Sequence, residues 1–189
     1  MELVTAQQIL NDNGFPAGPA DGIYGARTRA ALQHFQNATT HPLWNAGGYD
    51  DATINALNQL PQLSTNFTVN EVRSTGNGNC YIRSELLNAL EDLRLIINRE
   101  IPIASGYRDA KRNALLPGSA TNSLHLYGLA ADITSLAVHV TLNEVRNMGI
   151  CSGIGWVRTT GFVRHIDLRH LTGRHTQTPW NPSIWSYRK

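Results

Sequence analysis

The 189-residue sequence lacks a long hydrophobic run, a strong net charge and a cysteine framework. No run of about 18 apolar residues is present, which excludes a membrane-spanning helix and argues against membrane insertion. The N-terminal residues MELVTAQQILNDNG contain no basic region followed by an apolar core, so we expect no signal peptide and synthesis in the cytoplasm. With 16 Lys and Arg against 14 Asp and Glu, the net charge of +2 gives no reason to expect nucleic acid as a partner.

The two cysteines, Cys80 and Cys151, are too few for a disulfide scaffold, and their spacing fits no zinc ribbon or redox motif. We expect two reduced, partly buried thiols, since free cysteines are common in cores. A single disulfide between them is the alternative.

What the sequence does contain is an approximate internal repeat at a constant offset of 25 residues. Gly22 matches Gly47, Tyr24 matches Tyr49, and the threonine of each copy precedes a helical pattern. We expect Thr28 or a neighbour to cap the helix of the first copy. The repeat predicts one small unit used twice and a compact all-α, three-helix domain over residues 1–62.

The run GFPAGPADGIYGARTRAALQHFQ, residues 14–36, resembles the three-helix peptidoglycan-binding domain. The likeness covers roughly residues 3–60 and implies bacterial peptidoglycan as the partner, with Asp21 and Tyr24 as candidate binding residues. A helical bundle without a ligand is the alternative.

Residues 63–70 are polar and follow a proline, so we predict a linker there and a second domain over residues 71–189. That domain mixes predicted helices and strands without a βαβ rhythm, which favours an α+β fold with a small antiparallel sheet. The helices are expected at 81–98 and 142–148, and the strands at 101–105, 125–133, 153–156 and 162–168.

His125 and Asp132 stand seven residues apart, and Gly128 between them allows the chain to turn. Histidine nitrogen and carboxylate oxygen are zinc ligands, and a catalytic site needs three. His165 is the best third candidate, and Asp167 lies on the same face of its strand. His34, His41, His139, His170 and His175 are expected to have no ligand role.

The pattern Ser123-x-His125-x-x-Gly128-x-Ala130-x-Asp132 resembles the zinc peptidases that include D-alanyl-D-alanine carboxypeptidases and L-alanyl-D-glutamate peptidases. The runs 105–108, SGYR, and 162–169, FVRHIDLR, are similar to two further elements of this family. The resemblance implies a zinc ion held by His125, Asp132 and His165, and an active-site role for Arg108.

The sequence departs from that family at the general base. Many members carry Glu three residues before the last histidine, or His two residues before it, where this chain has Phe162 and Val163. Asp167 is our candidate base and His170 the runner-up, while Asp167 could instead orient the ligands.

Arg108 suits an oxyanion or a stem-peptide carboxylate, with a surface ion pair as the alternative. Ser123 and Tyr107 fit substrate positioning, because neither lies in a nucleophile-elbow context.

Together these features predict a monomeric, zinc-dependent peptidoglycan peptidase that hydrolyses amide bonds of stem peptides or cross-links. Its setting would be that of a bacteriophage endolysin, made in the host cytoplasm and acting on the wall after release. The alternative is a zinc-containing wall-binding protein without catalysis. A glycan-cleaving hydrolase would need a placed pair of carboxylates, and Glu85, Glu91 and Asp92 fit a solvated helix face instead.

Overall fold

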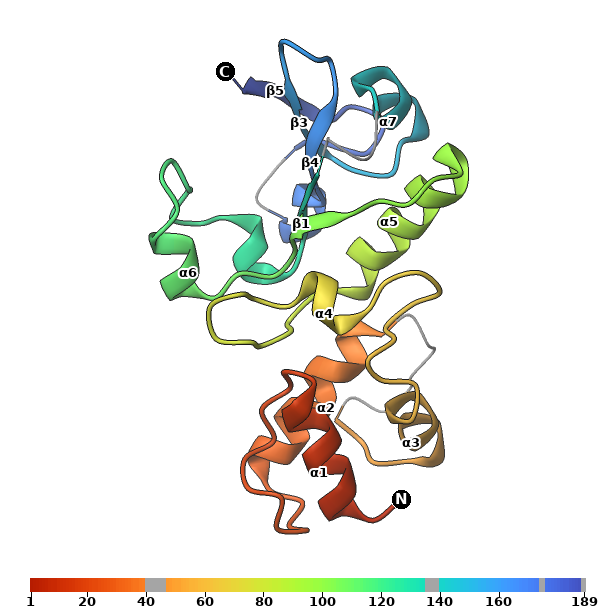
Figure 1. Cartoon of the computed structure of the whole chain (residues 1–189), viewed down its shortest axis with the longest axis vertical. Helices are drawn as coiled ribbons and strands as arrows, with labels where there is room; N and C mark the ends of the chain where they lie inside the picture. The colour runs from red at the N-terminus through yellow and green to blue at the C-terminus, as the bar shows by residue number, and fades with distance from the viewer. Residues whose placement is uncertain (40–46, 135–139, 174–175, 188–189) are drawn as a thin grey trace.

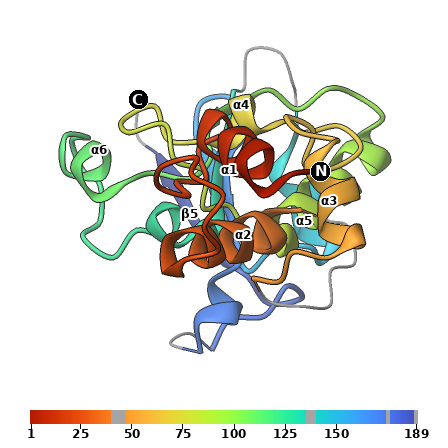
Figure 2. The same cartoon turned by 90° about the horizontal axis from the view of Figure 1, so that it is seen from below.

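The computed structural model describes residues 1–39, 47–134, 140–173 and 176–187. In this part of the chain a helical unit lies at the N-terminal end and a mixed helix and strand unit at the other end (Figure 1). The view from below has the first unit in the foreground (Figure 2). This unit consists of α1 (Leu3–Asp12), α2 (Ala26–Ala38) and α3 (Asp51–Leu57), as the repeat predicts.

Each copy of the repeat is held by one glutamine of the preceding helix. Gln7 accepts a bond from the Gly22 N–H at 2.8 Å and donates to the Thr28 hydroxyl at 3.0 Å. In the second copy, Gln36 binds Gly47 N at 2.6 Å and the Thr53 hydroxyl at 2.9 Å.

The cap of α2, expected at Thr28 or a neighbour, is not Thr28 itself. Gly25 is the N-cap of α2, and Thr28 points inward, 2% exposed, where its hydroxyl meets Gln7.

Residues 63–70 differ from a solvated linker. Leu63, Phe67 and Val69 are each no more than 1% exposed and belong to the hydrophobic core that runs through both units. The short helix α4 (Val69–Val72) begins here with a capping box formed by Thr68 and Glu71. The segment is mostly polar in composition, but its three apolar residues are buried. Because they join a core with residues of both units, the two units are packed together.

The second unit contains the two predicted helices and three more short ones. Leu86, Leu90 and Leu93 of the longest helix, α5, are fully buried, as its apolar spacing predicts. The helices are α5 (Ser84–Ile97), α6 (Ala110–Ala114), η1 (Leu124–Tyr127), α7 (Leu142–Met148) and η2 (Arg169–Thr172).

The sheet has the order β1-β2-β4-β3-β5. Its strands are β1 (Ile103–Ser105), β2 (Ala130–Ile133), β3 (Gly153–Val157), β4 (Val163–Asp167) and β5 (Ser183–Tyr187). The first four pair antiparallel, which confirms the predicted α+β fold, and the strands predicted at 153–156 and 162–168 correspond to β3 and β4, which pair with each other. β5 was not predicted and pairs parallel with β3, so the C-terminal tail completes the sheet.

Cys80 and Cys151 are free and buried, as expected. None of the described helices is long and apolar enough to cross a membrane. The residues His41, His139 and His175, for which no ligand role is expected, lie outside the described part of the chain.

Candidate metal centre

Two neighbouring elements deliver the first two candidate ligands. His125 lies on the single turn η1, and Asp132 lies on β2, which follows at once. Gly128 ends η1 in the left-handed region at φ 66°, and a Cβ there would collide with the Tyr81 carbonyl oxygen. Glycine is thus required twice at this turn, for its backbone conformation and for close contact with the preceding chain.

His165 reaches the same place through strand register. Asp132 of β2 lies directly opposite His165 of β4. The His165 Nδ1 is 2.8 Å from Asp132 Oδ1, and the His125 Nε2 is 3.4 Å from the same oxygen. One donor atom of each of these three residues lies within 4.8 Å of the other two.

The donor set fits a zinc ion. The His125 Nδ1 is 2.7 Å from the Gly106 carbonyl oxygen, so Nδ1–H donates and Nε2 keeps its lone pair. This Nε2 is buried and has no hydrogen-bond partner. Nitrogen and oxygen ligands about 2.0–2.1 Å from one tetrahedral ion lie about 3.3 Å apart, close to the His125–Asp132 separation.

The electrostatics of Asp132 and His125 favour the protonation states that a metal needs. Burial raises the pKa of Asp132, but the adjacent His125 and His165 imidazoles outweigh it and hold that pKa far below its usual range. Burial lowers the pKa of His125, so its imidazole is neutral. An ionised carboxylate beside a neutral imidazole is the ligand form of both residues.

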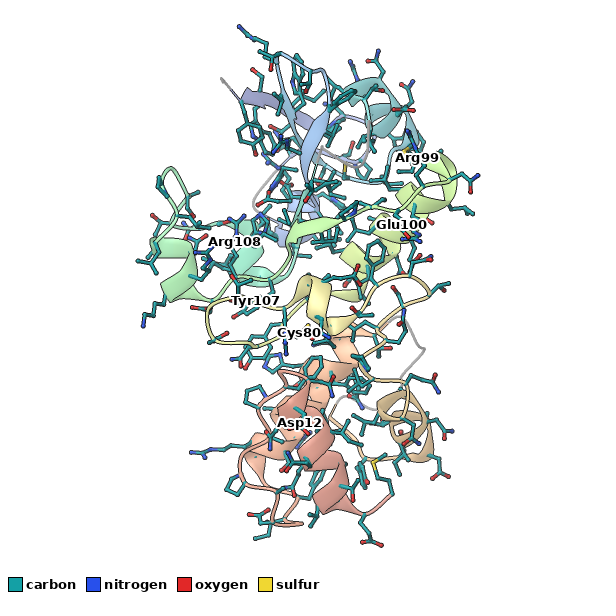
Figure 3. The ribbon with its side chains drawn as sticks, in the orientation of Figure 1. Asp12, Cys80, Arg99, Glu100, Tyr107 and Arg108 are labelled. Carbon is teal, nitrogen blue, oxygen red and sulfur yellow. The ribbon has the colours of Figure 1, made fainter. Side chains whose placement is uncertain are left out.

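Arg108 braces this carboxylate. Its guanidinium pairs with Asp132 Oδ2, and its Nε donates to Ser105 Oγ at 2.9 Å. The side chain is 12% exposed, which leaves a cation at the edge of the cleft. Figure 3 places Arg108 and Tyr107 on the side of α6, opposite Arg99 and Glu100.

Asp167 lies behind His165, not free in the cleft. Its Oδ2 is 3.2 Å from His165 Nε2, and both of its oxygens accept from the Arg169 guanidinium at 2.9 and 2.7 Å. Burial raises the pKa of Asp167, but the hydrogen bonds with Arg169 and His165 bring it down to about 2. These contacts favour the orienting role over the role of base.

The donor atoms open into a cleft of about 540 Å³. Ser123 and Arg108 line it, as does Asp167. Tyr107 is 8% exposed and packs on Tyr81 at 5.1 Å between ring centres, outside the lining.

The other proposed site residues also lie outside the cleft. His170 Nδ1 is 2.8 Å from the buried Ser152 hydroxyl, and His170 is not part of the lining. Asp21 and Tyr24 belong to the helical unit, where Asp21 accepts from Gln7 and Tyr24 donates to the Gly47 carbonyl.

Among the lining residues to which the sequence analysis gave no role are Arg169, Trp185 and Tyr187. Trp185 of β5 lies 5.2 Å from the His165 ring, and the Arg169 guanidinium carbon lies 4.9 Å from the Trp185 ring centre. Gly155 leaves the room for both tail rings, because a Cβ there would press on Trp185 and Tyr187. The short spacing of Asp167, at the end of β4, and Arg169, at the start of η2, was the available signal.

A His, Asp and His donor set at the floor of an open cleft, on a small mixed sheet, fits the metal site of a metallopeptidase domain. The chain belongs to the peptidase M15 family, whose profile matches residues 59–167. Residues 2–57 match the family described as a peptidoglycan binding domain.

A curated relative agrees with this assignment. The chain is 29% identical to the zinc D-Ala-D-Ala carboxypeptidase of Streptomyces albus G, over 85% of this chain and 68% of that protein. The predicted arrangement of a peptidoglycan-binding domain before a zinc peptidase domain is thus confirmed, and so is zinc as the cofactor.

Proposed function

We propose that this protein hydrolyses amide bonds in the stem peptides or cross-links of bacterial peptidoglycan. One observation carries the proposal: the unpartnered Nε2 of His125 faces Asp132 and His165 in an open cleft. The peptidoglycan-binding domain on the same chain supports the choice of substrate. The name of the Streptomyces relative supports a peptide bond at D-alanine as one target.

His125, Asp132 and His165 would hold the zinc ion. When bound, zinc lowers the pKa of a water molecule and polarises the scissile carbonyl. Gly106 fixes the ring of His125, and Arg108 pairs with Asp132 and holds it in place.

Arg108 also presents the cleft with a fixed cation suited to a substrate carboxylate or a developing oxyanion. Among the described residues of the cleft lining, only Asp132 and Asp167 carry a carboxylate. Asp132 would hold the zinc ion, which leaves Asp167 as the carboxylate of the cleft to test as a proton acceptor. Asp132 is the more exposed, with a side chain 29% exposed against 2% for Asp167.

The second candidate function is wall binding through a zinc-containing domain without catalysis. Phe162 and Val163 stand at the two positions where related peptidases carry a general base. Both carboxylate oxygens of Asp167, the remaining candidate, accept hydrogen bonds from Arg169. This candidate predicts retained zinc and retained wall affinity without turnover.

The physiological setting we propose is that of an endolysin. The protein would act as a monomer on the wall after release from the cytoplasm by another protein. Wall turnover inside a bacterium is the competing setting, and the same chemistry serves both.

Digestion of purified peptidoglycan, with products read by mass spectrometry, tests the proposal. Release of new amino termini that stops on chelation and in His125→Ala is the expected result, and the product masses name the bond. Zinc-loaded protein that binds the wall and releases nothing supports the binding candidate instead.

A further inference from the structure

The metal cleft continues toward the helical unit through two further hollows. The middle hollow, about 510 Å³, shares Asn122 and Leu124 with the metal cleft. The junction hollow, about 250 Å³, shares Arg83 and Tyr127 with the middle one. Because neighbouring hollows share lining residues, the three lie in a row from the metal cleft to α2, and we call this row the groove.

The far end of this groove reaches the peptidoglycan-binding domain. His34 and Asn37 of α2 line the junction hollow, and the His34 ring stacks on Tyr81 at 4.1 Å between centres. The Cys80 N–H donates to the Gly14 carbonyl at 2.9 Å, which ties the two units together beside this hollow. Figure 3 shows Cys80 at the level where the units meet.

The lining suits an uncharged, hydroxyl-rich ligand with flat apolar faces. Tyr127, on the same turn as His125, is 46% exposed and offers a ring along the groove. Asn37 and Asn122 add exposed amides, and the single cation, Arg83, is already paired with Glu85 at 2.5 Å. No carboxylate lines the middle or junction hollow among the described residues.

An extended peptide fits this lining less well than a sugar chain does. Peptides that bind in extended form commonly add to an exposed sheet edge. The walls of the middle and junction hollows come from α2, η1, η2 and the turn before α5, so among the described residues no strand edge faces these two hollows. Tyrosine and asparagine side chains, in contrast, match the apolar faces and hydroxyls of sugar rings.

We propose that this groove holds the glycan strand of peptidoglycan, and that Tyr127 and Asn37 contact its sugars. A strand seated there runs from the wall-binding domain to the metal cleft, and its stem peptide then enters the cleft beside His125. This proposal rests on the proposed function for its substrate. It adds that the helical unit and the metal-binding unit bind the same glycan strand.

Binding of peptide-free glycan strands, prepared from peptidoglycan with an amidase, tests the groove apart from catalysis. In heteronuclear NMR of the full chain, we expect shifts of the Asn37 and Asn122 side-chain amides. Tyr127→Ala and Asn37→Ala should each weaken glycan binding about 5- to 10-fold. Trp180→Ala is the control, because Trp180 is 76% exposed and lies outside all three hollows.

The same variants are compared on intact peptidoglycan and on an isolated stem peptide. We expect the ratio of kcat/KM on peptidoglycan to kcat/KM on the stem peptide to fall in Tyr127→Ala and Asn37→Ala, and to stay constant in Trp180→Ala. Unshifted asparagine amides with undiminished binding in both variants would overturn the groove assignment, as would shifts caused by stem peptide alone. Failure of the wild type to cut either substrate would instead count against the peptidase function.

Discussion

The His165 imidazole is held from both edges by carboxylates, Asp132 at Nδ1 and Asp167 at Nε2. Asp167 is in turn clamped by both arms of Arg169. A ligating histidine whose other nitrogen donates to a carboxylate is fixed in tautomer and orientation. Asp167 therefore acts on the metal through His165.

Replacement of Asp167 by asparagine tests this positioning role. We expect Asp167→Asn to weaken zinc affinity about 10- to 100-fold, because the His165 ring loses its charged partner. Competition with a chromogenic chelator measures the affinity, and Glu144→Gln, in the remote capping box of α7, is the control. Unchanged zinc affinity with lost kcat would assign Asp167 to proton transfer instead.

Two tryptophans near the C-terminus, Trp185 in the cleft and Trp180 outside it, serve as test and control for the role of the cleft. Trp185 contacts His165 and Arg169, whereas Trp180 is 76% exposed. We expect Trp185→Ala to lower kcat/KM about 10-fold, since a partly buried cation–π contact contributes about 1–2 kcal/mol. Trp185→Phe should restore part of the loss, and Trp180→Ala should match the wild type. Equal effects of the two alanine variants would remove Trp185 from the site.

The metal ligands and β5 differ in how well the sequence predicts them. The His125 and Asp132 spacing, with Gly128 between, is local, so the motif places both residues correctly. The partnership of Asp132 with His165 depends on the register of β2 against β4, across 33 residues, and follows only from a family resemblance or a structure. β5 was missed because its apolar and aromatic residues are only partly buried and it joins the sheet through a parallel crossover.

The repeat gives a stability prediction. Gln7 is 1% exposed and satisfies Gly22 and Thr28, whereas its neighbour Gln8 is exposed and binds only Asp12. We expect Gln7→Ala to lower the free energy of unfolding by about 2 kcal/mol, because buried polar partners lose their hydrogen bonds. Gln8→Ala should change it little. Urea denaturation followed by circular dichroism compares the two, and equal stabilities would contradict the shared design of the two turns.

The repeat is visible in the sequence, but the two glutamines that hydrogen-bond to its turns are not. Gln7 and Gln36 are 29 residues apart, while the turns they hold are 25 apart, so the alignment of the turns does not pair them. The polar letters of residues 63–70 likewise concealed buried Leu63, Phe67 and Val69. In both places packing decides which residues turn inward.

The thiols give a chemical prediction. Burial raises the pKa of both Cys80 and Cys151 to about 12. Both therefore stay protonated at pH 8, and neither should react with Ellman's reagent in the folded protein. Two equivalents should react after denaturation without reductant. A single equivalent or none would mean oxidation, and fast reaction of the native protein would contradict the burial.

Asp109 gives a pH prediction for stability. It caps α6 by accepting from Arg112 N at 3.0 Å, and it accepts from the Ser74 hydroxyl at 2.6 Å. The Ser74 bond, with the backbone bonds, lowers the pKa of Asp109 below its ordinary 3.8. Because the folded-state pKa is depressed, this stabilisation is complete above the unfolded value and is lost as the pH falls through the folded one.

We therefore expect Asp109→Ala to destabilise the protein by about 1–2 kcal/mol at pH 7 and by less as the pH falls below 3.8. Asp92→Ala, an exposed carboxylate on α5, is the control. Thermal melts across pH measure both, and a constant difference from the wild type at all pH values would contradict the ionic contribution.

Zinc titration of the metal-free protein on purified peptidoglycan, with released amines counted, tests the central claim most directly. We expect turnover to rise with added zinc, to level off at one equivalent per chain, and to be absent in His125→Ala. Protein that takes up one zinc, binds the wall and releases no amine would contradict the peptidase account and leave a wall-binding protein in its place.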